Sequence, residues 1–136
     1  MTRAAVVSAI NSYLSAAYDG PIAIHSETSS QTTDPPYAVV RIGSGDQLYP
    51  GQAEIWDMNV MVGVFHDSDE TSAATAESQA GTLFALLDDP DDLFAASGST
   101  LAWSAWERSG TEASITETRW QHVAVFRAIV APAAES

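Results

Sequence analysis

Apolar and polar residues alternate along residues 54–65, and this is the clearest pattern in the chain. Every second position there is apolar, the set being Trp56, Met58, Val60, Val62 and Val64. A period of two predicts a strand with one face in a core. The polar residues 66–70 follow, where Asp67 or Ser68 can cap a helix. Helical spacing comes next and predicts a helix with the apolar stripe Ala73, Ala76, Ala80, Phe84 and Leu87.

The segments before this strand predict a further helix and a further strand. Residues 3–18 form the helix, whose apolar stripe is Val6, Val7, Ile10, Tyr13, Leu14, Ala17 and Tyr18. Gly20 and Pro21 end it, and residues 22–24 are either a short strand or an anchor in the core. Residues 25–36 are rich in serine and threonine and predict a mobile loop. A strand over residues 37–42 and a glycine-containing connection over residues 43–51 lead to the central strand.

The segments after the second helix predict two more strands. Pro90 breaks that helix, and Asp91 or Asp92 begins a short helical turn. Strands are expected over residues 101–108 and 115–131, with a turn at 109–114 and a frayed tail at 132–136. The last strand has one mostly apolar face, made of Trp120, His122, Ala124, Phe126, Ala128 and Val130. The order predicts one α+β domain over residues 1–136, with a largely antiparallel four-stranded sheet and two main helices packed on one face.

The composition and charge of the chain bear on whether it spans a membrane, is secreted or binds nucleic acid. The chain has 136 residues, of which 46% are hydrophobic, and it has no cysteine. It has no apolar run of about 18 residues, so no membrane span is expected, and its N-terminus does not have the pattern of a signal peptide. Net charge is −13, from 18 acidic and 5 basic residues. The five arginines are spread along the chain and predict no basic stripe. The excess of acidic residues has two possible explanations. It either keeps the protein soluble or forms a surface that lets DNA pass without binding it.

No motif in the sequence predicts catalysis. Four acidic residues, Asp88, Asp89, Asp91 and Asp92, lack the spacing of an EF-hand and read as a solvated helix end. The histidines His25, His66 and His122 are not spaced for a local zinc site. The four tryptophans fall in predicted strands, where core packing or subunit contact explains them. No cofactor and no metal are expected. A small metal-dependent hydrolase using His25, His66 and the aspartates is the enzymatic alternative.

Several segments in their order carry a resemblance to a known family. They are Pro35-Pro36-Tyr37-Ala38-Val39-Val40, the glycine-containing arm, His66-Asp67 before a helix ending in Leu86-Leu87, and Trp120-Gln121-His122 with Phe126. In this order of elements the chain resembles the tail terminator, or tail completion, proteins of long-tailed bacteriophages. The likeness covers nearly the whole chain, and it departs from the family in an unusually acidic, alanine-rich and serine-rich composition.

The resemblance implies a structural virion protein rather than an enzyme. Such proteins form a hexameric ring that caps the tail tube, ends tube polymerisation and joins the tail to the head connector. The implied partners are other copies of the chain, the tail tube protein and a head connector or neck protein, while DNA passes through the ring without specific binding and no membrane takes part. The implied place is the head-proximal end of the virion tail, after assembly in the host cytoplasm. A different head-tail joining protein or a tail tube subunit is the alternative of the same class.

Two groups of residues are expected at subunit or partner contacts. Leu48 and Tyr49 are apolar residues in the glycine-containing arm, and exposed strand edges and such an arm can supply the contact between different patches that a ring needs. The acidic turn with Asp88, Asp89, Asp91 and Asp92 is expected to oppose self-stacking through its dense like charge.

Overall fold

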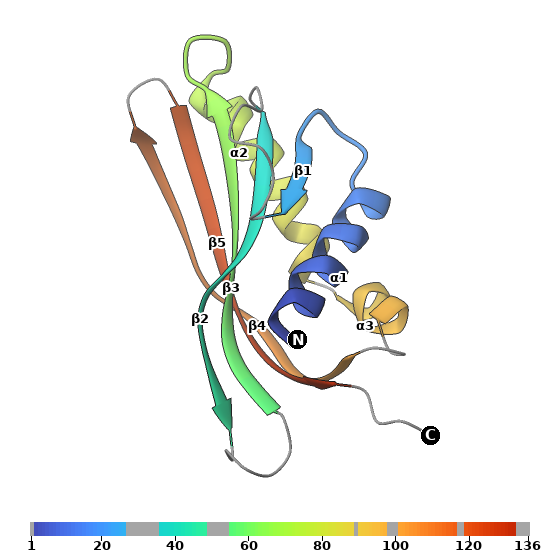
Figure 1. Ribbon diagram of the computed structural model, residues 1–136. Coiled ribbons are helices and arrows are strands. Elements are labelled where there is room, and N and C mark those ends of the chain that lie inside the picture. Colours follow the sequence, from blue (N-terminus) through green and yellow to red (C-terminus); the bar gives the residue numbers. More distant parts are fainter. Residues whose placement is uncertain are drawn as a thin grey trace.

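A computed structural model describes residues 2–26, 36–48, 55–88, 90–97, 101–116 and 119–132 of the chain (Figure 1). In this part of the chain three helices and five strands form one α+β fold. Their order is α1 (Thr2–Ala17), β1 (Ala23–Ser26), β2 (Tyr37–Leu48), β3 (Ile55–Asp67), α2 (Ala73–Asp88), α3 (Asp91–Ser97), β4 (Leu101–Thr116) and β5 (Arg119–Pro132).

The strands form one mixed sheet in the order β1-β2-β3-β5-β4. The pairs β2–β3, β3–β5 and β5–β4 are antiparallel, and β1 runs parallel to β2 at one edge. The four-stranded prediction is therefore one strand short. The additional strand is β1, in the segment for which the sequence allowed either a short strand or an anchor in the core. It has only four residues, which is too short to show a period, and its pairing with β2 joins segments that the sequence separates by a polar stretch.

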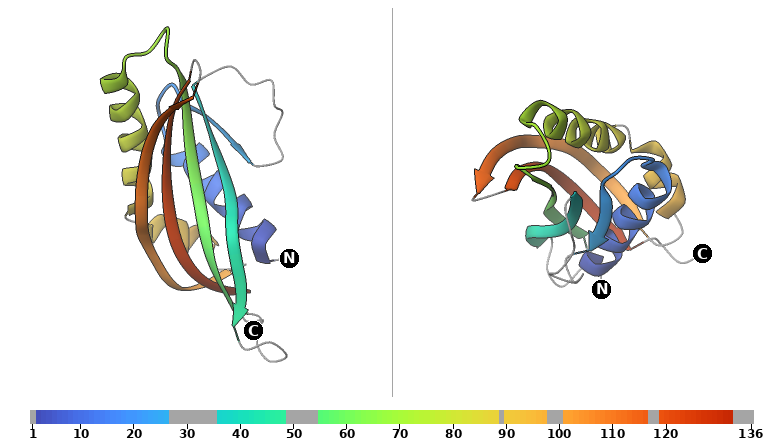
Figure 2. Two further views of the ribbon diagram at one scale, coloured as in Figure 1. Left: turned by 90° about the vertical axis from the view of Figure 1, so that its left-hand side faces the viewer. Right: turned by 90° about the horizontal axis from the view of Figure 1, so that it is seen from above.

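The central strand β3 confirms the strongest sequence pattern. Its residues Met58, Val60, Val62 and Val64 are fully buried, and His66 continues the same face. The neighbouring β5 buries Ala124, Phe126, Ala128 and Val130 in the same way. All three helices lie behind the sheet in the left view of Figure 2, so these buried residues point toward the helices. None of the helices in the described part of the chain lies on the other face of the sheet.

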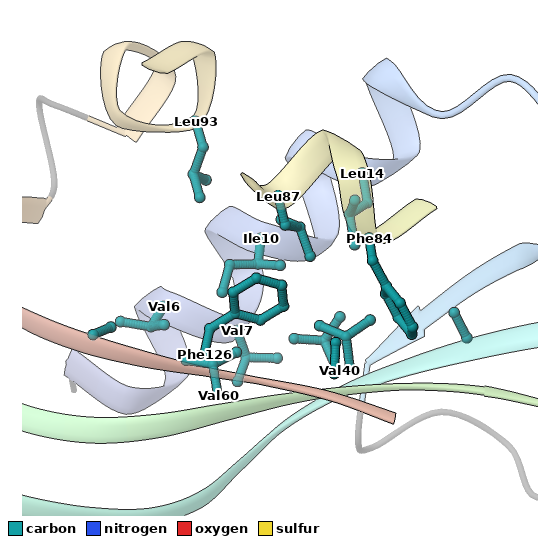
Figure 3. Packing of buried hydrophobic residues seen from close by; sticks show 14 of the residues in the cluster. Val6, Val7, Ile10, Leu14, Val40, Val60, Phe84, Leu87, Leu93 and Phe126 are labelled. Atoms are coloured by element: carbon teal, nitrogen blue, oxygen red, sulfur yellow. The ribbon is translucent and has the colours of Figure 1, made fainter. Parts of the chain in front are cut away.

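The core fills the space between the helices and the buried face of the sheet. Figure 3 shows α1, α2 and α3 directing apolar side chains toward β2, β3 and β5. The helices contribute Val6, Val7, Ile10, Leu14, Ala80, Leu83, Phe84, Leu87 and Leu93, which are at most 7% exposed. The apolar stripes predicted for the first two helices are thus confirmed as buried in the middle of each helix. Ala17 and Ala73, at the helix ends, are exposed. No helix within the described ranges is long and apolar enough to cross a membrane.

Two predicted connections are strand instead. The expected turn at residues 109–114 belongs to β4, which pairs with β5 as far as Thr116↔Arg119. Serine, glycine and threonine there suggested a turn, but a bulge between Arg108 and Gly110 accommodates the glycine. Likewise β2 continues through the glycine-containing connection to Leu48, with a bulge between Ile42 and Ser44.

The cap of α2 differs from the expected one. Because β3 runs on to Asp67, that residue ends a strand, and its Oδ1 accepts a hydrogen bond from the Asp69 N–H at 2.8 Å. The helix begins at Ala73, and Ser72 is its N-cap: the Thr75 N–H donates to Ser72 Oγ at 3.2 Å. The cap therefore satisfies one of the free N–H groups of the first turn.

Some predictions concern residues outside the described ranges. Most of the predicted loop at 25–36 lies there, although residues 25 and 26 belong to β1. The predicted tail at 132–136 lies there too, apart from Pro132, which ends β5.

Candidate assembly interface

The face of the sheet that carries no helix, called the open face below, is lined by partly apolar side chains. Strand alternation places on it Tyr37, Val39 and Arg41 of β2, Asn59, Met61 and Phe65 of β3, Val123, Val125 and Arg127 of β5, and Glu107 and Glu112 of β4. The apolar members are half-buried by their neighbours on the sheet. An uncovered face of this kind is a common place for contact with another protein.

Within the described ranges, both sides of the sheet end in edges with unpaired backbone. On one side β1 covers β2 only from Tyr37 to Val40, so residues 41–48 have no strand beyond them in the described fold. On the other side β4 is the last strand over its whole length, from Leu101 to Thr116. An edge strand presents a row of free N–H and C=O groups that can pair with another chain.

The two halves of β4 differ in how regularly they pair with β5. The first half carries both register shifts of the strand, between Trp103 and Ala105 and between Arg108 and Gly110. Bulges disrupt the ladder and protect an edge from pairing. Residues 110–116 pair with β5 without a shift and contain no proline or lysine. Ile115 in this half is 55% exposed, so the regular part of the edge also presents an apolar side chain.

Aromatic side chains attach the first half of β4 to the helices. Trp106 Nε1 donates to the carbonyl of Leu87 at 2.7 Å, and its ring stacks on Phe126 at 4.9 Å. Trp103 Nε1 donates to Ser97 Oγ at 2.8 Å. These contacts fix the position of the edge strand relative to α2 and α3.

The open face carries charged side chains of both signs, with Asp57, Glu107 and Glu112 among its acidic residues. Three of the arginines, Arg41, Arg119 and Arg127, lie on the open face, whereas no arginine or lysine occurs between residues 42 and 107. The strand register places these arginines on one face but keeps them apart, because Arg119 and Arg127 are eight residues apart along β5. Arg127 pairs with Asp57 at 2.7 Å, and its hydrogen bond is the main reason that the pKa of Asp57 is lowered. Arg119 donates to Tyr37 Oη at 2.7 Å.

The structure places the predicted contact residues in four different surroundings. Leu48 is the last residue of β2 and so ends the free edge rather than sitting in a turn. Tyr49 and Asp89 lie outside the described residues. Asp88 ends α2, where Arg108 from β4 donates to its two oxygens at 2.9 and 2.6 Å. This ion pair explains how an acidic residue is accommodated at a helix C-terminus, which by itself disfavours negative charge.

The remaining two acidic residues, Asp91 and Asp92, are exposed in the first turn of α3, an end that favours negative charge. Beside them α1 and α3 border a groove of about 740 Å³. It is lined mainly by small residues: Ala5, Ser8, Ala9, Ser12, Tyr13, Ala16, Ala17, Asp92, Leu93, Ala96, Ser97 and Leu101. The acidic turn and Leu48 belong to different elements. No sequence pattern predicted the groove.

Two histidines are buried between the sheet and α2. His66 Nε2 hydrogen-bonds with Gln79 Oε1 at 2.8 Å. The Nδ1 atoms of His66 and His122 have no hydrogen-bond partner among the residues that the structure describes. Burial lowers the pKa of His122, the nearby His66 adds to this effect, and Glu77 opposes it. Among the described residues, no group of three histidine, aspartate or glutamate side chains is placed to hold a metal ion.

Comparison with known proteins identifies a shared fold. No protein-family model matches the sequence. No curated protein matches it either. Among solved structures, the chain is similar to a chain of the "Virion of native gene transfer agent (GTA) particle", with a TM-score of 0.54 and 17% sequence identity. The alignment covers 80% of this chain and 78% of that chain. This α+β arrangement of sheet and helices is therefore also found in a chain of that virion.

Proposed function

We propose that this chain is a structural virion protein, and that it forms a ring which caps a tail tube, ends tube polymerisation and joins the tail to the head connector. The observation that carries the proposal is the fold shared, over 80% of this chain, with a chain of a gene transfer agent virion. The resemblance of the sequence to tail terminator proteins supports the finer part, including six copies per ring.

The geometry of the sheet supports ring formation. In the described fold β4 is one edge of the sheet, and on the opposite side the short edge strand β1 leaves part of β2 uncovered; the two exposed edges have different sequences. Two different patches that meet between identical copies make a heterologous contact, which closes into a ring when the rotation allows it. A chain with two unlike free edges is suited to that kind of contact.

The charge of the chain supports the passage of DNA. Each copy carries a formal net charge of −13, so a ring of such copies repels phosphate groups at long range. A channel through which DNA travels must not bind it strongly, and phosphate binding requires clustered basic side chains. On the open face two of the three arginines are already engaged by Asp57 and Tyr37.

Ending a tube requires two unlike ring faces. One face matches the last ring of the tube, and the other must not recruit a further copy. Asp91 and Asp92 are exposed and belong to a segment dense in carboxylates, so their repulsion opposes stacking of one ring on another. Replacing both by asparagine should then yield columns of stacked rings in electron micrographs. A control with Asp69→Asn and Glu70→Gln, exposed acidic residues at the other end of α2, should give single rings.

The test of the function is tube assembly in the presence of this protein. Mixing it with its cognate tube subunit should give shorter tubes, each with one ring at an end, when lengths are measured by electron microscopy. Tubes that grow past the bound protein, or that never bind it, contradict the terminator role and favour a different joining protein. Incorporation of the chain along the tube wall would identify it as a tube subunit.

A further inference from the structure

We propose that the free chain pairs with a second copy of itself through the regular half of β4, residues 110–116, in an antiparallel ladder centred on Ala113. The inference goes beyond the proposed function, because it concerns the chain before it enters a ring. A ring closed through β4 uses this edge for a different contact, so the pair must separate before such a ring forms. Until then, the pairing covers an edge that is otherwise exposed.

The second half of β4 is an edge strand that is open to pairing. β4 is the last strand of the sheet in the described fold, and its second half forms the outer left margin of the sheet in Figure 1. None of the described helices lies beyond that margin in this view. Natural edges that must stay unpaired carry bulges, prolines or lysines. Both register shifts of β4 lie before Gly110, and residues 110–116 contain no proline or lysine.

The helix side of this segment complements itself in a two-fold arrangement. In an antiparallel pair centred on Ala113, residues equally distant from Ala113 on its two sides face each other, so Thr111 faces Ile115 of the second copy. Both lie on the helix side of the sheet, because their partners on β5 are Ala124 and Trp120. Cross-strand contacts between β-branched side chains stabilise a sheet. Ile115 is 55% exposed in the isolated chain, and the pairing would cover it in both copies.

The open-face side of the segment is compatible with the same arrangement. Glu112 faces Ser114 of the second copy, and a serine hydroxyl can donate a hydrogen bond to a carboxylate. Both residues are exposed in the isolated chain, so their side chains are free to meet. No like charges lie directly opposite each other in this register.

Neighbouring registers are less favourable. A shift by one residue places side chains of opposite sheet faces next to each other. A ladder centred on Glu112 puts two carboxylates directly opposite, which is destabilising, and extends into a bulge of the strand. A ladder centred on Ser114 pairs only residues 112–116 of this segment, whereas the ladder centred on Ala113 pairs all of residues 110–116.

Single-cysteine cross-linking tests the pairing directly, because the chain contains no cysteine of its own. Ala113→Cys places two cysteines opposite each other, where the Cα atoms of an antiparallel pair are about 4.5–5.5 Å apart and within the reach of a disulfide. The matched control is Ser104→Cys. Ser104 is exposed in the first half of the same strand, and no residue of β4 faces it in this register.

Under mild oxidation Ala113→Cys should form a covalent dimer on a non-reducing gel at least tenfold faster than Ser104→Cys. Equal rates in the two variants, or no dimer, overturn the proposal and leave the edge to a partner other than a second copy.

A second measurement tests the register through charge. Glutamate at both 111 and 115, or lysine at both, puts like charges opposite each other across the pair, whereas Thr111→Lys with Ile115→Glu puts unlike charges there. Within one copy the two positions lie about 13 Å apart along the strand, so each substituted side chain meets mainly the second copy. The Lys/Glu variant also keeps the wild-type net charge of −13, since it adds one charge of each sign.

In sedimentation equilibrium both like-charged variants should associate at least tenfold more weakly than the Lys/Glu variant. Like-charged variants that associate as tightly as the Lys/Glu variant overturn the proposed register. Circular dichroism of each variant checks that the fold is kept, and the cysteine experiment does not depend on these substitutions.

The outcome is separable from that of the tube assay. A covalent dimer of Ala113→Cys without any effect of the wild-type protein on tube length supports the pairing and contradicts the terminator function. Shortened tubes without such a dimer support the function and contradict the pairing.

Discussion

Replacing Trp106 by phenylalanine tests how the edge strand is held against the helices. The indole Nε1 of Trp106 donates to the carbonyl of Leu87 at 2.7 Å, close to the end of α2 at Asp88. That carbonyl belongs to the last turn of the helix, whose C=O groups have no partner within the helix. Phenylalanine keeps an aromatic ring beside Phe126, whose centroid lies at 4.9 Å, but it has no donor for the carbonyl.

The magnitude follows from these contacts. An unpartnered polar group in a protein interior costs about 1–3 kcal/mol, and because Trp106 is only half-buried we expect about 1–2 kcal/mol from the lost donor. Trp106→Ala also removes the stacked ring, which raises the cost to about 3–5 kcal/mol. Trp103→Phe is the matched control. Its acceptor, Ser97 Oγ, still donates to the Leu93 carbonyl at 2.7 Å, so we expect about 0.5–1 kcal/mol.

Urea unfolding followed by far-ultraviolet circular dichroism measures these differences without depending on tryptophan fluorescence. For a chain of this size, with a slope of about 2 kcal/mol per molar urea, Trp106→Phe should lower the midpoint by roughly 0.5–1 M. The reasoning fails if Trp106→Phe unfolds at the wild-type midpoint. It also fails if Trp103→Phe lowers the free energy of unfolding as much as Trp106→Phe does, because the loss would then not come from the unpartnered carbonyl at the end of the helix.

Three further predictions concern stability and binding. Ser72→Ala removes the cap of α2 and should cost about 0.5–2 kcal/mol in thermal unfolding, whereas Ser68→Ala, at the position favoured by sequence, should cost less. The pKa of His122 is lowered below its usual 6.5, so the unfolded state takes up a proton first as the pH falls. The contribution of this group to the free energy of unfolding is therefore present above pH 6.5 and lost below it. His122→Asn should make the free energy of unfolding depend less on pH between pH 7.5 and 5.5. If the pH dependence of the variant equals that of the wild type, His122 does not cause it. Duplex DNA should show no specific binding in fluorescence anisotropy at physiological salt, and a micromolar, salt-sensitive affinity would overturn the argument from charge.

The parts of the fold that could be predicted are those with one buried face. Val60 and Val62 alternate with less buried residues, and Ile10 and Leu14 recur at helical spacing, because burial selects apolar residues on one side only. The second half of β4 is exposed on both faces around Glu112, so no alternation marks it. Its strand conformation comes from pairing with β5, which depends on residues far along the chain.

The candidate interface could be predicted only in part. Leu48 was expected at a contact, and in the structure it ends the free edge of β2. Which strand lies at an edge depends on the order of the strands in the sheet. The pattern of apolar and polar residues does not predict that order. The parallel partner β1 sets where the edge of β2 becomes free, and for residues 22–24 the sequence left open whether they form a short strand or an anchor in the core. Arg41 and Arg127 are distant in sequence and share the open face only because of the strand register.

The most direct test of the proposed virion role is to look for this chain in purified phage particles and to locate it there. Gold-labelled antibody against the protein, applied to purified virions and viewed by electron microscopy, should label a single position at the junction of head and tail. Label along the length of the tail would show a tube subunit, and virions without label would contradict a structural role in the particle.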